Sequence, residues 1–246
     1  MGDRGAALVT GAAGGIGLAI VDKLAHNGSD VFAHARAKSP EFESKLQLIS
    51  EKYSVNICPV YFDITDEEEM KSSLEQALSP KVMLNALVNN AGVAHGGLFQ
   101  MTKVSDIRSV FEVNFFSHLN LTQLVLRRMM RNDSGSIVNI SSIAGLTLRA
   151  GNSAYGTSKA ALIAWTKTLA AELGTSGIRV NAVAPGLTET YMAELMTPSA
   201  RDEMLAASAM KRKGMPQEIA SAVAYLVSSE SSFVNGQILR VDGGES

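Results

Sequence analysis

The chain has 246 residues, of which 46% are hydrophobic, and its formal net charge at pH 7 is −2. This apolar content can bury one large core, and α/β sheets of this length commonly form one unit, so we expect a single domain over residues 1–246. Acidic and basic residues are mixed along the chain. This mixture excludes a basic stripe or an acidic tail and argues against nucleic acid or a membrane as the main partner.

The number of cysteines indicates the redox state of the cellular compartment. The single cysteine, Cys58, rules out an internal disulfide and a cysteine-rich metal site, as is typical of a reducing compartment. The four histidines have no ligand spacing, so we expect no metal. Glycines interrupt the uncharged run over residues 5–21, unlike a signal peptide, and no run of about 18 apolar residues offers a membrane span. We therefore expect a soluble cytoplasmic protein.

Short β-rich segments alternate with longer amphipathic ones along the whole chain. The predicted strands cover residues 6–10, 30–35, 57–62, 84–90, 136–141, 178–184 and 236–241. This alternation is typical of the α/β class, a Rossmann-type doubly wound parallel sheet, here of about seven strands. Residues 190–214 depart from it. They are rich in Met and Ala and predict a small helical lobe, placed like a substrate lid.

The first predicted strand leads directly into TGAAGGIG, in which Gly11, Gly15 and Gly17 have the spacing G-x-x-x-G-x-G. At a strand-to-helix turn, glycines adopt backbone angles that other residues avoid, and they let a pyrophosphate approach the amides of a helix N-terminus. We therefore expect a dinucleotide here. The spacing differs from the G-x-G-x-x-G fingerprint, so tight packing alone is the alternative explanation.

Five motifs together carry a resemblance to a known family. They are TGAAGGIG at 10–17, NNAG at 89–92, YGTSK at 155–159, PGLTET at 185–190 and GQILRVDGG at 236–244. In this order and spacing, they make essentially the whole chain resemble the short-chain dehydrogenase/reductase family. Within it, the chain looks most like the 3-oxoacyl-[acyl-carrier-protein] reductases. The resemblance implies an NAD(P)-dependent oxidoreductase that transfers a hydride between a nicotinamide and a carbonyl or alcohol.

The YGTSK motif places Tyr155 and Lys159 one turn apart on a helix predicted over 153–174. A cation at that distance stabilises a phenolate, so we expect Lys159 to lower the pKa of Tyr155. The resemblance implies that Tyr155 exchanges a proton with the substrate oxygen and that Ser142 hydrogen-bonds this oxygen. It also implies that Asn114 holds a water that relays protons to Lys159. The alternative for Asn114 is a buried amide satisfied locally.

The resemblance also implies a set of cofactor-binding residues. They are Gly11, Ala13, Gly14, Gly15, Ile16, Gly17, Arg36, Asp63, Ile64, Asn90, Ala91, Gly92, Tyr155, Lys159, Pro185, Gly186, Thr188 and Thr190. In this assignment Asp63 and Ile64 line the adenine. An N-cap of the helix that TDEEEM begins is a second role open to Asp63.

The end of the second predicted strand indicates which nicotinamide cofactor is used. Ala35 stands where NAD-specific relatives have an acidic residue, and Arg36 follows it. A guanidinium can clamp the adenosine 2′-phosphate, with Lys38 as a helper, so we expect NADP(H) to be favoured over NAD(H). A solvated surface role is the alternative for Arg36. Gly14 is a departure, because many NADPH-using relatives have Arg or Lys at this place.

The substrate is the least determined feature of the sequence. Carrier protein is acidic, and the reductases that act on it present basic residues beside the mouth of the active site. The matching places here hold Asp133 and Ser176, although three arginines lie close by in the sequence, Arg127, Arg128 and Arg131. This thinner basic patch leaves a CoA-linked, sugar-derived or other small carbonyl substrate as the alternative to a carrier-bound one.

Two further expectations concern assembly and class. The resemblance implies a homotetramer joined through helices at roughly 103–131 and 153–174 and through the C-terminal strand. A non-catalytic, dinucleotide-sensing module is the alternative of a different class. The intact set of Asn114, Ser142, Tyr155 and Lys159 argues against that alternative.

Overall fold

The structure, a computed structural model, describes residues 5–79, 82–132 and 134–245. The described residues form one seven-stranded sheet in the order β3-β2-β1-β4-β5-β6-β7, with every neighbouring pair parallel. The strands are β1 Ala6–Val9, β2 Asp30–Ala35, β3 Ile57–Tyr61, β4 Leu84–Asn89, β5 Gly135–Ile140, β6 Ile178–Pro185 and β7 Ile238–Val241. The predicted fold class is confirmed.

Helices connect the strands. The α-helices are α1 Gly15–His26, α2 Pro40–Tyr53, α3 Glu67–Ala77, α4 Val104–Phe111, α5 Ser117–Met129, α6 Ala144–Thr147, α7 Tyr155–Leu173, α8 Tyr191–Glu194, α9 Pro198–Ala207 and α10 Pro216–Val227. Short 3-10 turns are η1 Phe99–Met101, η3 Met130–Asn132, η4 Gly174–Ser176 and η5 Ser229–Ser231, and a π-helix, η2, covers Glu112–Phe116. Among the described residues, no helix is long and apolar enough to cross a membrane.

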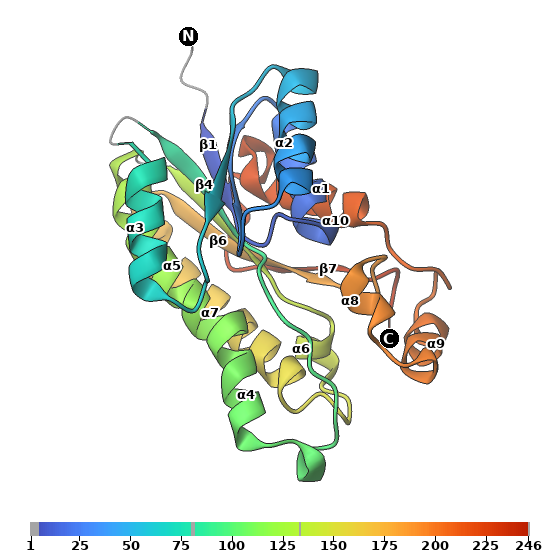
Figure 1. The fold of residues 1–246 in the computed structure, drawn as a ribbon. Coiled ribbons are helices and arrows are strands. Elements are labelled where there is room, and N and C mark those ends of the chain that lie inside the picture. The colour runs from blue at the N-terminus through green and yellow to red at the C-terminus, as the bar shows by residue number, and fades with distance from the viewer. Residues whose placement is uncertain (1–4, 80–81, 133, 246) are drawn as a thin grey trace.

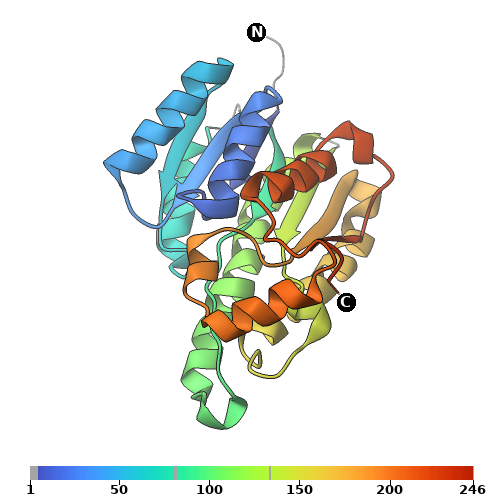
Figure 2. The same cartoon turned by 90° about the vertical axis from the view of Figure 1, so that its right-hand side faces the viewer.

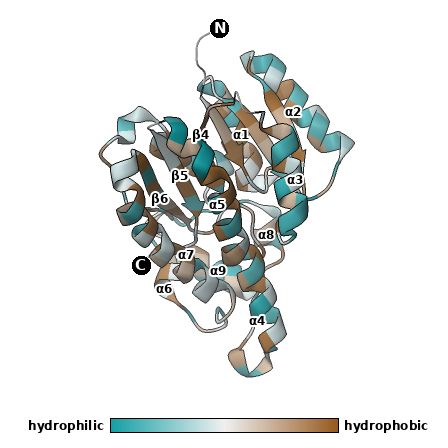
Figure 3. Cartoon of the chain, turned by 90° about the vertical axis from the view of Figure 1, so that its left-hand side faces the viewer, coloured by the Kyte–Doolittle hydropathy of each residue, from teal (hydrophilic) through white to brown (hydrophobic). Residues whose placement is uncertain are grey.

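The helices cover both faces of the sheet (Figure 1). Helices α1, α2 and α10 pack on one face around a core that includes Ile20, Phe42 and Val223. Helices α3, α5 and α7 pack on the other face around a core that includes Met70 and Leu121. Because both faces are covered, the central strands are rich in apolar residues, which Figure 3 shows in brown.

The strand order places the ligand-binding edge. The chain runs outward from β1 through β2 to β3 and then returns to β4 on the other side of β1. At such a switch point the loops that leave two adjacent strands diverge, which opens a crevice at the carboxyl ends of the strands. We call this side of the sheet the carboxyl edge. Every motif that the sequence analysis identified follows a strand or lies near this edge.

The predicted lobe lies below the carboxyl edge and contains α8 and α9 (Figure 2). Its base is closed by backbone bonds. The Glu189 N–H donates to the Gly214 carbonyl at 2.9 Å, and the Gly214 N–H donates to the Leu187 carbonyl at 2.9 Å. The lobe therefore leaves β6 and rejoins the chain just before α10 at nearly the same point.

Candidate functional site

The glycine-rich turn after β1 has the shape of an anion cradle. Gly11 has a φ of +64°, and a Cβ on it would lie 2.9 Å from the Ala91 Cα. A Cβ on Gly17 would lie 2.1 Å from the Gly11 carbonyl oxygen, so the turn admits no side chain there. Gly14 caps α1 without a side chain, and a Cβ on it would meet nothing within 4 Å. The first amides of α1 therefore have no side-chain cap, and the residues fit a dinucleotide pyrophosphate.

The NNAG segment after β4 holds this turn in place. The Asn90 amide nitrogen donates to the carbonyls of Thr10 and Gly11, at 2.8 and 3.1 Å. The Thr10 hydroxyl oxygen accepts from the backbone N–H groups of Asn90 and Ala91, at 2.9 and 3.0 Å. The Asn90 side chain thus acts on the turn itself. Thr10 was not among the predicted residues, although it is the first letter of the motif.

The loops after β2 and β3 meet at the outer part of the crevice. Arg36 is 82% exposed, and its guanidinium lies 2.9 Å from an Asp63 carboxylate oxygen. The Thr65 N–H and hydroxyl donate to Asp63 and, together with Arg36, hold the pKa of its carboxyl below the ordinary value. The second role predicted for Asp63 is wrong. Asp66, which directly precedes α3, caps it by accepting from the Glu69 N–H.

Ile64 is the other residue expected to line the adenine. Its side chain is buried in the core shared with α3 and α5, because its aliphatic body follows the inward direction of Phe62. Ile64 therefore presents its backbone, and not its side chain, to any ligand at this edge.

The segment after β6 reaches the glycine-rich turn. Pro185 ends β6, and a Cβ on Gly186 would lie 2.8 Å from the Asp242 Cα. The Thr188 hydroxyl donates to the Gly186 carbonyl at 3.0 Å. Thr190 caps α8, and its methyl carbon lies 3.2 Å from the place of a Cβ on Gly15. The PGLTET and TGAAGGIG motifs are therefore neighbours in space.

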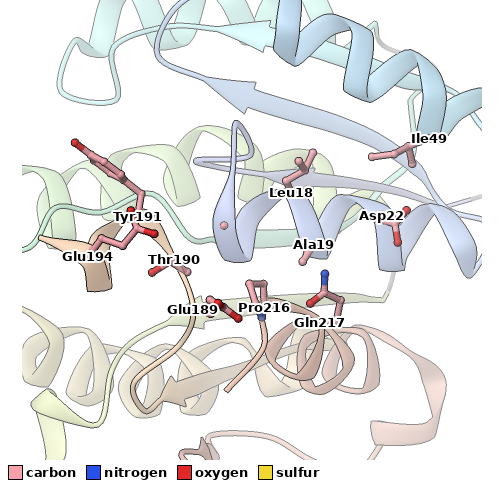
Figure 4. A pocket seen from close by; sticks show the side chains of 11 residues that line it. Leu18, Ala19, Asp22, Ile49, Glu189, Thr190, Tyr191, Glu194, Pro216 and Gln217 are labelled. Carbon is pink, nitrogen blue, oxygen red and sulfur yellow. The ribbon is translucent and has the colours of Figure 1, made fainter. Parts of the chain in front are cut away.

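A cavity of about 600 Å³ opens beside this contact (Figure 4). Helix α1 contributes Gly15, Leu18 and Asp22, and Tyr191 comes from α8. The cavity adjoins the glycine-rich turn. It is not lined by Ser142, Tyr155 or Lys159.

Tyr155 and Lys159 occupy the first turns of α7, as predicted from their spacing. The Lys159 Nζ lies 5.9 Å from the centre of the Tyr155 ring and donates to the Ile140 carbonyl at 2.8 Å. A Cβ on Gly156 would lie 2.9 Å from the Ala144 carbonyl oxygen, and one on Gly145 would lie 2.8 Å from the Ala160 nitrogen. The α6 turn and α7 therefore touch backbone to backbone.

The serines after β5 have different surroundings. The Ser141 hydroxyl donates to the Lys159 carbonyl at 2.9 Å, which ties α7 to the end of the strand. The Ser142 Oγ accepts from the Ala144 N–H at 3.1 Å. The Ser142 hydroxyl also hydrogen-bonds the Tyr155 side chain. Ser142 and Tyr155 thus converge on one place, and Ser141 supports the backbone.

Burial dominates the pKa values of this pair. Burial raises the pKa of Tyr155, and the hydrogen bond with Ser142 offsets only part of this rise. Burial also lowers the pKa of Lys159 to about 8. The expected lowering at Tyr155 is therefore not found in the chain without ligand. The physical reason is that removing the phenol from water disfavours its charged form, and the ammonium is itself weakened by burial.

Asn114 lies in the π-helix η2, and both ends of its amide are occupied. Its Oδ1 accepts from the Val93 N–H at 2.8 Å, and its Nδ2 donates to the Val93 carbonyl and to the Ser158 hydroxyl, both at 3.0 Å. A Cβ on Gly92 would lie 3.1 Å from the Asn114 Oδ1 and 3.5 Å from the Lys159 Nζ. The side chain is thus satisfied locally, beside Lys159.

Two buried histidines also contact the carboxyl edge, and sequence reasoning missed both. The His118 Nε2 hydrogen-bonds the Ala91 carbonyl at 2.8 Å, and burial lowers the pKa of this ring to about 3. His34 in β2 hydrogen-bonds backbone groups of Gly11 and Phe62. For His34, the signal in the sequence is a polar ring within a largely apolar strand, whereas His118 lies in helix α5.

The arginines in the last turn of α5 and in η3 lie far from this site. Arg127, Arg128 and Arg131 precede β5, whereas Ser142 follows it. A strand of this length spans about 20 Å, so these side chains start from the opposite edge of the sheet. Ser176, on η4 before β6, is at the same edge. Asp133 lies outside the described residues.

The chain is similar to known proteins over nearly its whole length. A family model described as enoyl-(acyl carrier protein) reductase matches residues 11–246. The 3-oxoacyl-[acyl-carrier-protein] reductase FabG of Thermotoga maritima is 38% identical over 96% of this chain and 96% of that protein. FabG of Escherichia coli is 37% identical over 97% and 96%. A solved 7α-hydroxysteroid dehydrogenase, complexed with NADH and a 7-oxo bile acid, has a TM-score of 0.92 at 34% identity and covers 99% of this chain and 94% of its own.

These likenesses extend over nearly the full length of the chain, and they do not favour a non-catalytic sensing module. The protein belongs to the short-chain dehydrogenase/reductase family and is an oxidoreductase that uses a nicotinamide dinucleotide.

Proposed function

We propose that the protein reduces a 3-oxoacyl thioester carried by acyl carrier protein, with NADPH as the favoured cofactor. The observation that carries this proposal is the identity of 37–38% to 3-oxoacyl-[acyl-carrier-protein] reductases over nearly the whole chain. The convergence of two hydroxyl groups, on Ser142 and Tyr155, supports a substrate oxygen as the reacting polar group. Reduction of a carbonyl therefore has more support than the enoyl reduction named in the family model.

Ser142 is oriented to donate. Its Oγ accepts from the Ala144 N–H, so the hydroxyl proton, which hydrogen-bonds Tyr155 in the ligand-free chain, is the group that it can turn toward a substrate carbonyl oxygen. Tyr155 then gives its phenolic proton to the same oxygen, and its raised pKa keeps that proton in place until it is needed. The hydride for the carbonyl carbon would come from a reduced nicotinamide when that cofactor is bound.

Lys159 assists this proton transfer through its charge. Its ammonium, near the Tyr155 ring, stabilises the phenolate that remains after the transfer. With a pKa of about 8, its Nζ can also release and regain a proton close to neutral pH. Asn114 and Gly92 lie next to the Nζ and fix the backbone around it. The active form of the site is thus a neutral Tyr155 beside a charged Lys159.

The preference for NADPH rests on Arg36. Its ion pair with Asp63 is exposed, and pairs of this kind contribute only about 0–1 kcal/mol. A 2′-phosphate offers more charge and a matching fork of oxygen atoms, so Arg36 can exchange Asp63 for it. Lys38, which lies 3.5 Å from Glu43, is occupied elsewhere.

A comparison of kcat/KM for NADPH and NADH tests the cofactor preference. We expect NADPH to be better, and Arg36→Ala to lower its affinity about tenfold while NADH binding stays unchanged. Lys38→Ala is the matched control for loss of surface charge. The preference is wrong if NADH serves equally well or if Arg36→Ala leaves NADPH binding unaltered.

A substrate panel tests the reaction. Acetoacetyl groups on carrier protein and on CoA are compared with a crotonyl thioester and with sugar, steroid and simple ketones. We expect the carrier-bound acetoacetyl group to be reduced with the highest kcat/KM. Efficient reduction of another carbonyl without turnover of either acetoacetyl thioester would move the assignment to a small-carbonyl reductase. We place this activity in the cytoplasm, in keeping with the single cysteine.

A further inference from the structure

His34 lies at the carboxyl edge of the sheet, although none of the family motifs contains it. It is 2% exposed and lies next to the last residue of β2, the strand between β3 and β1. The Gly11 N–H donates to its Nδ1 at 3.2 Å, and its Nε2 lies 2.9 Å from the Phe62 carbonyl oxygen. The ring also stacks on Phe62, with 3.9 Å between ring centres. One side chain thus joins the turn after β1 to the loop after β3.

The partners determine the protonation of this ring. A backbone N–H can only donate, so Nδ1 must be the acceptor and carry no proton. A carbonyl can only accept, so Nε2 must carry the proton. His34 is therefore neutral, with its proton on Nε2. Burial favours the same state by lowering the pKa of the ring below its ordinary value of 6.5.

The two groups that His34 holds belong to opposite ends of a dinucleotide site. On one side is Gly11, whose φ of +64° forms the turn toward the pyrophosphate. On the other side, Phe62 precedes Asp63, whose carboxylate pairs with Arg36. The Asp63 N–H donates in turn to a Glu69 carboxylate oxygen at 2.7 Å. A continuous series of contacts therefore runs from the glycine-rich turn to the adenine end.

We propose that His34 is a positioning residue for the dinucleotide, and that tight binding requires its neutral form with the proton on Nε2. A proton on Nδ1 would face the Gly11 N–H and remove the acceptor that fixes the turn. The inference rests on the proposed nicotinamide dinucleotide at this edge. It adds that His34 fixes the conformation of the glycine-rich turn although the His34 ring does not itself contact the dinucleotide.

Charged groups around the ring act on the same equilibrium. The carboxylates of Asp63 and Glu69 favour the protonated ring, whereas burial opposes it more strongly. Arg36 pairs with Asp63 and so weakens the pull of that carboxylate. His118, packed from α5, is itself neutral. Since only neutral His34 supports the turn, affinity for the dinucleotide should fall as the pH falls below 6.5.

Imidazole NMR of the ligand-free, full-length protein tests the protonation state directly. At about pH 7.5 we expect the His34 signals to show a neutral ring with its proton on Nε2, and they are assigned by their loss in His34→Asn. A proton on Nδ1, or a charged ring at this pH, would overturn the proposal.

Two variants separate the two contacts of the ring. His34→Asn places an oxygen near the position of Nδ1 and keeps an acceptor for Gly11, whereas His34→Gln keeps a donor for Phe62 only. We expect the dissociation constant of NADPH to stay within about threefold for the Asn variant and to rise about tenfold or more for the Gln variant. The value of kcat at saturating NADPH should not change. Exposed His26→Gln is the matched control.

The pH dependence keeps the proposal testable even if a variant folds poorly. In the wild type, affinity for NADPH should decrease over the pH range in which the NMR signals show His34 gaining a proton. A 2′-phosphate also titrates near pH 6, so the same series with NADH separates the two effects. The proposal is overturned if His34→Asn and His34→Gln bind NADPH equally well. It is also overturned if the affinity of the wild type for NADPH and NADH does not change as His34 gains a proton. If the wild type binds neither dinucleotide, the proposed function fails with it.

Discussion

At the scale of single residues, Lys159 is a cationic side chain that is buried. It is 3% exposed, and its Nζ has a backbone carbonyl and no carboxylate as its hydrogen-bond partner among the described residues. Burial of a charge without a counter-ion explains why its pKa falls from 10.5 to about 8. The site therefore holds an ammonium that is a stronger acid than usual beside a phenol whose pKa is raised.

This shift predicts the pH dependence of the reaction. Lys159 is charged below pH 8 and loses its proton above it, while the raised pKa of Tyr155 keeps the phenol protonated. We expect kcat/KM for carbonyl reduction to fall as the pH rises through about 8, measured as initial rates across a buffer series. A profile that stays flat to about pH 10 would contradict the role of Lys159.

The same shift affects stability with the opposite sign. The native state releases this proton near pH 8, and the unfolded chain releases it near 10.5, so the unfolded state binds more protons between these values. Stability therefore gains a contribution as the pH rises through this window. Activity and the Lys159 contribution to stability should consequently run in opposite directions above pH 8.

Removal of the Tyr155 hydroxyl tests the proton donor. We expect Tyr155→Phe to lower kcat by roughly 10²–10⁴ because the substrate oxygen loses its acid, while the dissociation constant of the cofactor changes by less than about threefold. Stopped-flow or steady-state kinetics and a binding titration measure the two quantities. Tyr225→Phe, on the outer side of α10, is the control. Full turnover in the Tyr155 variant would refute the assignment.

At the scale of elements, the glycine-rich turn tolerates change at one position and not at another. A Cβ at position 17 would overlap the Gly11 carbonyl at 2.1 Å, whereas position 14 is open and has an extended φ of −174°. We expect Gly17→Ala to cost roughly 3 kcal/mol and Gly14→Ala less than about 0.5 kcal/mol. Calorimetry should show Tm falling by roughly 6–12 °C in the first variant only. Equal melting of both would contradict this geometry.

The elements themselves were largely predictable from the sequence. All seven described strands begin and end within two residues of the predicted ranges, because strands buried on both faces read as short apolar runs between turns. Tyr155 and Lys159 were predictable because their helical spacing is local. The π-helix at Glu112–Phe116 was not predictable, since it accompanies the contact of Asn114 with Val93 in a separate loop.

The misses share a physical cause. His34 and Asp63 acquire their roles from partners on other strands or from the residue at which a helix begins, and neither can be read from the pattern around them. The direction of the Tyr155 pKa depends on the loss of water around the ring, which no spacing reveals. Local sequence thus determined the elements, and tertiary contacts determined the chemistry of the site.

At the scale of the whole molecule, several large apolar side chains of the described residues are exposed, and two pairs of them lie on or beside elements expected to join subunits. Phe116 and Leu124 are 47% and 37% exposed on the run from η2 to α5, and Phe233 and Leu239 are exposed beside and on β7. Two different self-complementary contacts generate a closed tetramer. We predict a homotetramer of about four times 26.1 kDa, measured by light scattering.

A charged substitution in either of these pairs should break the tetramer at a different subunit contact. Leu124→Glu and Phe233→Glu should each yield a dimer, because each removes one of the two contacts. Leu48→Glu, at an exposed position on α2, should leave the mass unchanged. A wild-type mass near that of one chain at micromolar concentration would contradict the prediction.

The backbone contact between the α6 turn and α7 has a consequence for protein engineering. Gly145 and Gly156 bring the two segments together without any intervening side chain, so the separation of Ser142 and Tyr155 does not depend on neighbouring rotamers. The lobe over residues 190–214 is tied to the chain at its base and again at the C-terminal segment, where the Ala209 and Met210 N–H groups donate to the Gly244 and Gly243 carbonyls. The atoms nearest to Gly145 and Gly156 come from outside the lobe. Replacing the lobe with one from another reductase should therefore change which carbonyl substrate is accepted, while the relative position of Ser142 and Tyr155 stays the same.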